Sequence, residues 1–321
     1  MNIKLNKVIA VCGLSFISAT ALAGNYPDRP IRLIHGFGAG GNADSVARVI
    51  GSELEKRLGQ SVVVESRTGA GGTIASGFVA KSPPDGYTLI MLTGGHTASA
   101  AMRKTLPYDP VADFSPISTV TVFPFVVAVR TEHPAKTLTE LLTKARGASE
   151  AVTFSSVGVG STQHLTGELL SSAAKAKMLH VPYRGGGAPA VAVIAGEVDV
   201  LVDTATVAGP QIAAGKLRAL GVTSAKPWPA LAGVPPVAQA LPGFEVMSWL
   251  GLAAPAKTPA DIIEKINATL ADISKDPAVQ KTIGGMGSQT DHMKPQEMRN
   301  MIERDITQWK QVVQEAAIPL Q

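Results

Sequence analysis

Cysteine is nearly absent from this sequence of 321 residues, in which Cys12 is the only one. Cys12 lies in an N-terminal stretch that we expect to be removed. The remaining chain would then have no disulfide, no thiol nucleophile and no cysteine-ligated metal. Long hydrophobic runs are also lacking, since none reaches the roughly 18 residues that a membrane helix needs. No basic run carries interleaved aromatics, so we expect no nucleic-acid partner.

The N-terminal stretch has the pattern of a secretory signal peptide. Lys4 and Lys7 precede an apolar run from Val8 to Ala19, and Ala21-Leu22-Ala23 supplies small residues of the kind that a signal peptidase reads. We therefore expect residues 1–23 to be cleaved before Gly24 and the mature protein to be periplasmic. Losing Lys4 and Lys7 takes the basic residues from 29 to 27 against 25 acidic ones, which leaves a nearly neutral chain.

A glycine-rich stretch, IRLIHGFGAGGNADSVARVI, occupies residues 31–50 and is typical of a strand, a turn and a helix. Gly36, Gly38 and Gly41 fit the G-x-G-x-x-G pattern of a dinucleotide site. Glu65 ends the next strand-like run, where a ribose-binding acid would stand. Export argues against a nucleotide, because NAD and ATP are scarce outside the cytoplasm.

A second unit of the same kind, AVTFSSVGVGSTQHLTGELL, occupies residues 151–170. Ligands of open α/β sheets lie beyond the carboxyl ends of the strands, and helix N-termini attract anions. Two lobes facing each other would place both turns in one cleft. We predict a first domain of residues 24–124 plus 248–321 and a second domain of residues 125–247.

Continuous apolar runs alternate with helical patterns along the chain, which predicts an α/β fold of mainly parallel sheets flanked by helices. In KTLTELLTKARG, Thr137 and Glu140 are spaced as a helix cap. Thr258 is expected to cap a helix with Pro259 as its first residue. Apolar residues recur at helical spacing after Pro295 and indicate core packing. The expected strands are 31–35, 61–65, 88–92, 125–130, 151–155, 178–182, 198–203 and 217–222, with a further strand before Thr258.

The mature chain also resembles a known family along its whole length. The matching segments include YPDRPIRLI, GAGGNADSVAR, LEKRLGQSVVVESRTGAGGTIA, PPDGYTLIML, LPYDPVADFSPIS, GVGSTQHLTGELL and HVPYRGGGAPAVAVIAGEVDV. The chain resembles the Bug family of extracytoplasmic solute receptors, the binding proteins of tripartite tricarboxylate transporters. The resemblance implies a two-domain periplasmic binding-protein fold that closes as a clamshell on a small carboxylate. It also implies recognition largely by backbone N–H groups, hydroxyls and water.

The candidate ligand-binding residues follow from the two turns and the strand ends beside them. Neither turn contains Lys or Arg, which agrees with recognition by backbone donors. At Gly40 we expect a positive φ and a close backbone approach. The predicted set is Phe37, Gly38, Ala39, Gly40, Gly41, Asp44, Thr93, Ser156, Gly158, Gly160, Ser161, Thr162, His164, Tyr183, Arg184 and Asp203. No cofactor or metal is expected.

Several of these residues also have a structural interpretation. Asp44 either caps the first helix or lies in the site, and Ser161 and Thr162 stand where hydroxyls commonly cap. His164 is either a ligand contact or a satisfied core histidine. Arg184 either faces the cleft mouth with Tyr183 or forms a solvated ion pair. Asp203 either selects a ligand that carries an amino or hydroxyl group or caps the next helix.

The expected function is capture of a small carboxylate for delivery to a membrane permease, by a protein that acts as a monomer and not as an enzyme. A co-receptor that reports its ligand to a membrane sensor is the alternative. A secreted hydrolase is a weaker alternative, because the G-x-S-x-G nucleophile elbow is absent around Ser161.

Overall fold

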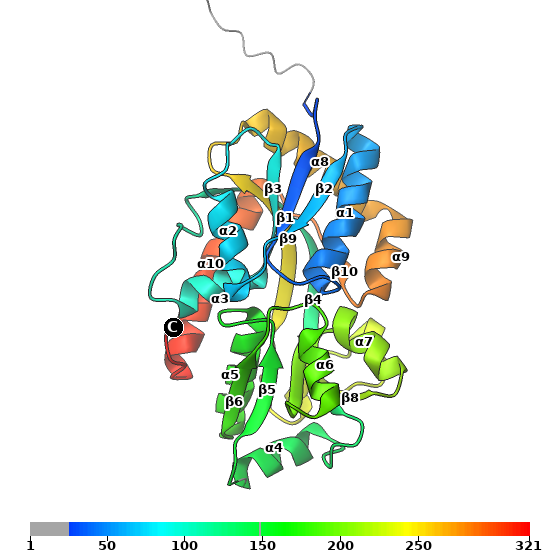
Figure 1. Cartoon of the computed structure of the whole chain (residues 1–321), viewed down its shortest axis with the longest axis vertical. Helices are drawn as coiled ribbons and strands as arrows, with labels where there is room; N and C mark the ends of the chain where they lie inside the picture. The colour runs from blue at the N-terminus through cyan, green and yellow to red at the C-terminus, as the bar shows by residue number, and fades with distance from the viewer. Residues whose placement is uncertain (1–25, 148) are drawn as a thin grey trace, which may run out of the picture.

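The structure is a computed structural model that describes residues 26–147 and 149–321. The predicted signal peptide and its cleavage site before Gly24 lie outside the described residues. Figure 1 shows two stacked lobes, with β4 and β9 passing between them. The strands are β1 (Ile31–His35), β2 (Val62–Ser66), β3 (Thr88–Thr93), β4 (Phe114–Arg130), β5 (Val152–Ser156), β6 (Met178–Pro182), β7 (Val200–Thr204), β8 (Leu217–Val222), β9 (Met247–Pro255) and β10 (Gln289–Thr290).

Helices flank the strands in both lobes. The helices are α1 (Asn42–Leu58), α2 (Thr73–Val79), α3 (Gly94–Met102), α4 (Leu138–Gly147), α5 (Thr162–Ala174), α6 (Ala188–Ala195), α7 (Ala205–Ala213), α8 (Ala260–Lys275), α9 (Pro277–Gly285) and α10 (Pro295–Glu315). Among the described residues, no helix is long and apolar enough to cross a membrane.

The sheet pairs in the order β2-β1-β3-β9-β4-β7-β5-β6, with β8 and β10 also paired to β4. We call the part built on β1, β2, β3, β9, β10 and the first half of β4 the first lobe. The second lobe is built on β5 to β8 and the second half of β4. The strands that lead into helices pair in parallel, β1 with β2 and β3, and β5 with β6 and β7. The fold is therefore the expected α/β clamshell, joined by antiparallel pairings of β4 and β9.

Strand β4 belongs to both lobes. It pairs with β9 from Phe114 to Pro124, and with β7 from Phe125 to Val129. The sequence indicated only the second half of this strand, because Pro116 and Pro124 argue against a strand interior. The register of β4 against β9 shifts beside Pro116, where an irregular ladder tolerates a residue without an N–H donor.

Local sequence signals account for several helix ends. Thr137 Oγ1 accepts from the Glu140 N–H at 3.2 Å, which confirms the predicted cap of α4. Thr258 does not cap α8 as predicted. Its hydroxyl instead donates to the Pro255 carbonyl at 2.8 Å, and Pro259 precedes the helix. The Thr258 hydroxyl therefore closes the turn after β9 instead of satisfying an N–H of the helix.

The apolar residues that recur at helical spacing after Pro295 pack in the core, as predicted. Met298, Ile302, Ile306 and Val313 are buried along α10. Val313 joins an apolar cluster with Met102 of α3 and Leu165 of α5. The end of α10 thus reaches the second lobe, as Figure 1 also shows.

Candidate ligand-binding site

The first turn, residues 36–41, is ordered by a buried carboxylate. Asp44 Oδ2 accepts from the Gly40 N–H at 3.0 Å. Asp44 Oδ1 lies 3.2 Å from His35 Nε2 and 2.9 Å from Arg48 Nη2. Burial by itself would raise the pKa of Asp44, but the hydrogen bonds from Arg48 and Gly40 and the charge of Arg48 hold that pKa below its usual value. Asp44 is therefore an ion that shapes the turn.

The second turn, residues 157–161, is ordered by neutral groups. Ser161 is the N-cap of α5, and its hydroxyl accepts from the His164 N–H at 3.2 Å. The same hydroxyl donates to the Gly158 carbonyl at 2.7 Å. Ser156 Oγ accepts from the Gly158 N–H at 3.0 Å. Both hydroxyls are occupied within the turn, as the structural interpretation of Ser161 expects.

Two stacked histidines lie under the second turn. The rings of His164 and His180 are 3.8 Å apart, and His180 also stacks on Phe154. His164 Nδ1 accepts from the Gly160 N–H at 3.3 Å, and His180 Nε2 lies 2.6 Å from Ser156 Oγ. Burial, with a smaller contribution from His164, lowers the pKa of His180 to about 3. The neutral form of His180 therefore belongs to the folded state.

A third glycine turn, residues 69–72, faces the second turn across the lobe boundary. A Cβ on Gly71 would lie 2.6 Å from the Val159 carbonyl oxygen, which is closer than a side chain can approach. Arg103 Nη2 bridges the Ala70 and Val159 carbonyls at 3.2 Å each. Ser99 Oγ donates to the Gly160 carbonyl at 2.9 Å. We assigned this turn no role from the sequence, yet its backbone lies directly against the backbone of the second turn.

The first turn meets a different segment of the second lobe. Gly38 bridges to Gly185, and a Cβ on Gly186 would lie 2.5 Å from the Ala39 carbonyl oxygen. Gly40 has the expected positive φ of 75°, but a Cβ there would meet nothing within 4 Å. The close approach expected at Gly40 on ligand binding stays a prediction. In this conformation the backbones of the two lobes meet at Gly38 and Gly186 instead.

A cavity of about 40 Å³, room for a few water molecules, lies between the lobes. Its walls come from the first and second glycine turns and from strand ends of both lobes. The lining residues are Phe37, Gly41, Asn42, Ala43, Thr93, Phe123, Phe125, Val157, Thr162, Gln163, Gly186, Asp203, Thr204, Val207, Ser248 and Leu250. Among these described residues, Asp203 is the only one with an ionisable side chain.

Four helices begin at this cavity. Asn42 and Thr162 are the first residues of α1 and α5, and Thr93 and Thr204 are the N-caps of α3 and α7. The first N–H groups of a helix have no partner within it, and the helix dipole gives that end a partial positive charge. Four such ends favour a negatively charged group at the cavity without a lysine or an arginine.

The predicted residues divide into those at the cavity, those that support it and those that are exposed. Phe37, Gly41, Thr93, Thr162 and Asp203 line the cavity. Arg184 is exposed, while Ala39 and Gly40 lie on the outer side of the first turn. Gly38, Asp44, Ser156, Gly158, Gly160, Ser161 and His164 hold the turns in place, and Tyr183 donates its N–H to Ser156 O.

Several lining residues were not predicted. Asn42 and Gln163 stand in the first turns of their helices, directly after Gly41 and Thr162, so their positions could have suggested them. Thr204 follows Asp203 at the strand end. Ser248 and Leu250 of β9 carry no signal in the sequence, because only the crossing of the chain between the lobes brings them here.

The nucleotide interpretation of the first turn fails at Glu65. Its carboxylate forms two hydrogen bonds with Arg32, Nε to Oε1 at 2.6 Å and Nη2 to Oε2 at 2.8 Å. The acid is therefore paired with its neighbouring strand. Among the described residues, no group of three or more His, Cys, Asp or Glu side chains could hold a metal ion.

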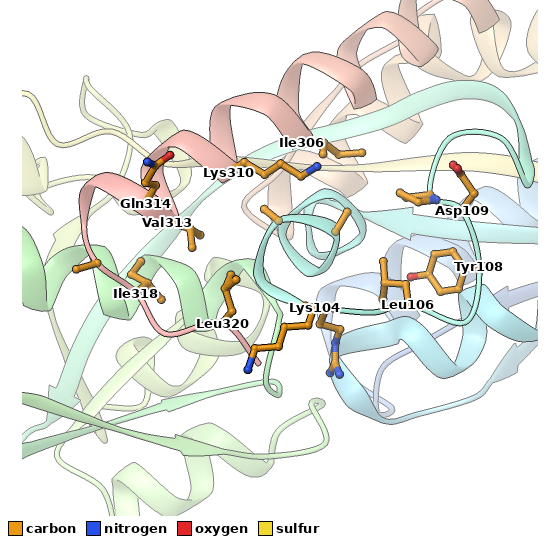
Figure 2. Close-up of a pocket in the computed structure, with 15 residues that line it drawn as sticks. Lys104, Leu106, Tyr108, Asp109, Ile306, Lys310, Val313, Gln314, Ile318 and Leu320 are labelled. Atoms are coloured by element: carbon orange, nitrogen blue, oxygen red, sulfur yellow. The ribbon is translucent and has the colours of Figure 1, made fainter.

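A larger groove of about 1090 Å³ lies outside the lobe boundary, between α3, the segment after it and the end of α10. Figure 2 shows Tyr108 and Asp109 on one side and Gln314 and Ile318 on the other, with Lys104 beside Leu320. The groove contains neither glycine turn and none of the predicted ligand-binding residues. We therefore place the candidate site at the smaller cavity, where the helix N-termini meet.

Comparison with known proteins identifies the family of the chain. The family model of the tripartite tricarboxylate transporter family receptor matches residues 46–318. BugT of Bordetella pertussis is 30% identical, covering 99% of this chain and 99% of its own.

Three solved structures share the fold. The periplasmic binding protein BugD is 30% identical over 92% of this chain and all of its own, with a TM-score of 0.88. A Rhodopseudomonas palustris protein, Rpa4515, solved with adipate, is 33% identical over 92% of this chain and 99% of its own, with a TM-score of 0.89. MatC of the same organism, solved with malate, is 32% identical over 90% of this chain and all of its own, with a TM-score of 0.86.

Proposed function

Because the chain belongs to the receptor family of tripartite tricarboxylate transporters, we propose that it captures a small carboxylate between its lobes and delivers it to a membrane permease. Similar structures are periplasmic binding proteins, two of them solved with the carboxylates adipate and malate. These neighbours are solute-binding proteins, which argues against the hydrolase alternative. Export by a cleaved signal peptide is part of the proposal.

The convergence of four helix N-termini on one cavity carries this proposal. Backbone N–H groups and hydroxyls can satisfy a carboxylate without immobilising a long basic side chain. Thr162 and Ser248 offer hydroxyls from the two lobes. A ligand held by both lobes would stabilise their contact, as a clamshell receptor requires.

We propose that the lobes move as residues 24–124 plus 248–321 against residues 125–247. The partner change in β4 between Pro124 and Phe125, and the start of β9 at Met247, supply the two crossings. A cavity of about 40 Å³ is small for a dicarboxylate. Ligand entry therefore requires the lobes to separate, a motion that hinge proteins make in microseconds to milliseconds. X-ray scattering should show a smaller radius of gyration with ligand than without it.

The decisive experiment is a melting series of the purified protein with adipate, malate, their neutral diamides and NAD. A ligand at about 100 times its dissociation constant stabilises the folded state by roughly 2.7 kcal/mol. For a chain of this size that is a shift of several degrees. We expect shifts with the carboxylates alone. Equal shifts with a carboxylate and its diamide, or a shift with NAD, would refute an anion site.

Delivery to a permease needs its own test. Uptake of a labelled carboxylate that binds the receptor should fall when the receptor gene is deleted and return with the intact gene. Unchanged uptake together with lost induction of a target gene would favour the sensor alternative. We expect the receptor to sediment as a monomer in both states.

A further inference from the structure

Asp203 has an unused hydrogen-bond acceptor in the wall of the cavity. It stands near the end of β7 and is 2% exposed. Asp203 Oδ1 accepts from the Thr204 N–H at 2.7 Å and lies 3.5 Å from Gln163 Nε2. Asp203 Oδ2 has no hydrogen-bond partner in the part of the chain that the structure describes. The arrangement does not serve as the predicted cap, since the side chain of Asp203 bonds the N–H of its neighbour and no deeper N–H of α7.

Within residues 26–147 and 149–321, no positive charge compensates Asp203. Its partner on β4 is Val126, and the lining residue of α5 nearest to it is Gln163. The ionisable residues His164 and Glu168 of α5 face each other at 3.5 Å and do not line the cavity. Burial raises the pKa of Asp203 to about 7, and hydrogen bonds from Thr204 and Gln163 only partly offset this.

A lining residue of the first lobe offers an unused donor. Asn42 is 7% exposed, and its Oδ1 lies 2.7 Å from the Thr206 hydroxyl, while its Nδ2 has no hydrogen-bond partner. Buried polar atoms are rarely left unpaired, and an exception calls for an explanation. Here one free donor and one free acceptor line the same cavity. A ligand that complements both carries a carboxylate and, apart from it, a hydrogen-bond donor.

We propose that Asp203 determines specificity, accepting a hydrogen bond from a hydroxyl or ammonium group on the carboxylate ligand. This inference rests on the proposed carboxylate binding and narrows its substrate class. A ligand with carboxylates alone leaves Asp203 Oδ2 unpaired and brings like charge toward it. Sites built to bond a polar substrate group discriminate strongly against the analogue that lacks it.

The test is titration calorimetry with three ligands that share a four-carbon chain: succinate without a donor, malate with a hydroxyl and aspartate with an ammonium group. We expect malate or aspartate to bind the wild-type protein at least tenfold more tightly than succinate. The preference for aspartate should grow from pH 6 to pH 8.5 as Asp203 ionises. This series uses the wild-type protein and so decides the question even if a variant fails to fold.

Asp203→Asn sharpens the result, because its amide can keep the Thr204 contact while replacing the free acceptor with a donor. We expect the preference over succinate to disappear, because malate and aspartate lose their acceptor while succinate loses the like charge that opposed it. Asp199→Asn is the matched control, since Asp199 lies at the other end of β7 and bonds Thr153. The control should retain the preference.

Two outcomes overturn the proposal while carboxylate binding stands. In one, succinate binds wild type as tightly as malate and aspartate. In the other, Asp203→Asn tightens all three ligands equally, which would show that an ionised Asp203 only repels the ligand carboxylates and accepts no hydrogen bond from the ligand. If no carboxylate binds at either pH, the proposed function fails as well.

Discussion

The two glycine turns have similar sequences, but different chemistry holds them. The first turn depends on Asp44, a buried carboxylate that accepts from Gly40 N–H and contacts His35 and Arg48. The second turn depends on the hydroxyls of Ser156 and Ser161 and on the imidazole rings of His164 and His180. A strand-turn-helix pattern thus specifies the path of the backbone and leaves open how it is stabilised. The two turns should therefore respond differently to mutation and to acid.

The largest effect is expected from Asp44→Ala. The change leaves the Gly40 N–H and the buried His35 without their partner, and hydrogen bonds to charged groups contribute more than neutral ones. We expect the free energy of unfolding to fall by about 3 kcal/mol, measured by urea denaturation with an unchanged m-value.

Arg48→Gln is the control for Asp44. The Arg48 side chain is 62% exposed, so its ion pair is screened by solvent. We expect Arg48→Gln to lower the free energy of unfolding by less than about 1 kcal/mol. If Asp44→Ala were as mild as Arg48→Gln, the first turn would not depend on its carboxylate.

Acid should affect the second turn through His180. Its pKa is lowered to about 3, so the unfolded chain binds a proton that the folded state excludes between pH 6.5 and about 3. The stability that depends on an uncharged His180 is therefore fully present above pH 6.5 and is lost as the pH falls toward 3. The ring is half-buried, so solvent screens part of this effect. We expect His180 to account for a loss of about 1 to 2 kcal/mol in the free energy of unfolding between pH 7 and pH 5.

His180→Gln isolates this contribution, since glutamine can contact Ser156 without titrating. His35, His96 and His133 also have pKa values lowered by burial, so the wild-type protein loses stability in acid from several sites. The measurement is therefore the difference between variant and wild type in melting temperature against pH. Parallel curves would show that His180 binds its proton equally in the folded and unfolded states, so that folding does not lower its pKa.

Gly71→Ala tests how the lobes meet. The added Cβ would lie 2.6 Å from the Val159 carbonyl oxygen, and the φ of Gly71 is 67°. We expect at least a tenfold loss of carboxylate affinity by calorimetry, equivalent to about 1.4 kcal/mol. Gly59→Ala shares the positive φ of 74° but meets nothing within 4 Å, so it reports backbone strain alone. Equal affinity in the two variants would place the third turn away from the closing interface.

The sequence predicted the strand-turn-helix units well because they arise from local signals. The strand of residues 31–35 and the Thr137 cap needed only neighbouring residues. Asp203 was identified as a strand end on the ligand side, and it lines the cavity. Which segments face each other was not predictable, since the contact of Gly71 with the second turn depends on how two lobes dock. Ser248 reaches the cavity for the same reason.

Ser161→Ala should have the smallest effect. The hydroxyl caps α5 and donates to Gly158 O, so its removal should lower the free energy of unfolding by about 1 kcal/mol, as cap losses typically do. Thr137→Ala removes a comparable cap from α4, away from the cavity, and should match that stability loss without changing carboxylate affinity. Because both hydrogen-bonding roles of Ser161 are used inside the turn, we expect its variant to lose affinity only severalfold, through a less ordered turn. A loss of carboxylate affinity as large as that of Gly71→Ala would mean that the Ser161 hydroxyl turns toward the ligand when the lobes close. The chemistry of the two turns would then differ less than their contacts in the ligand-free structure suggest.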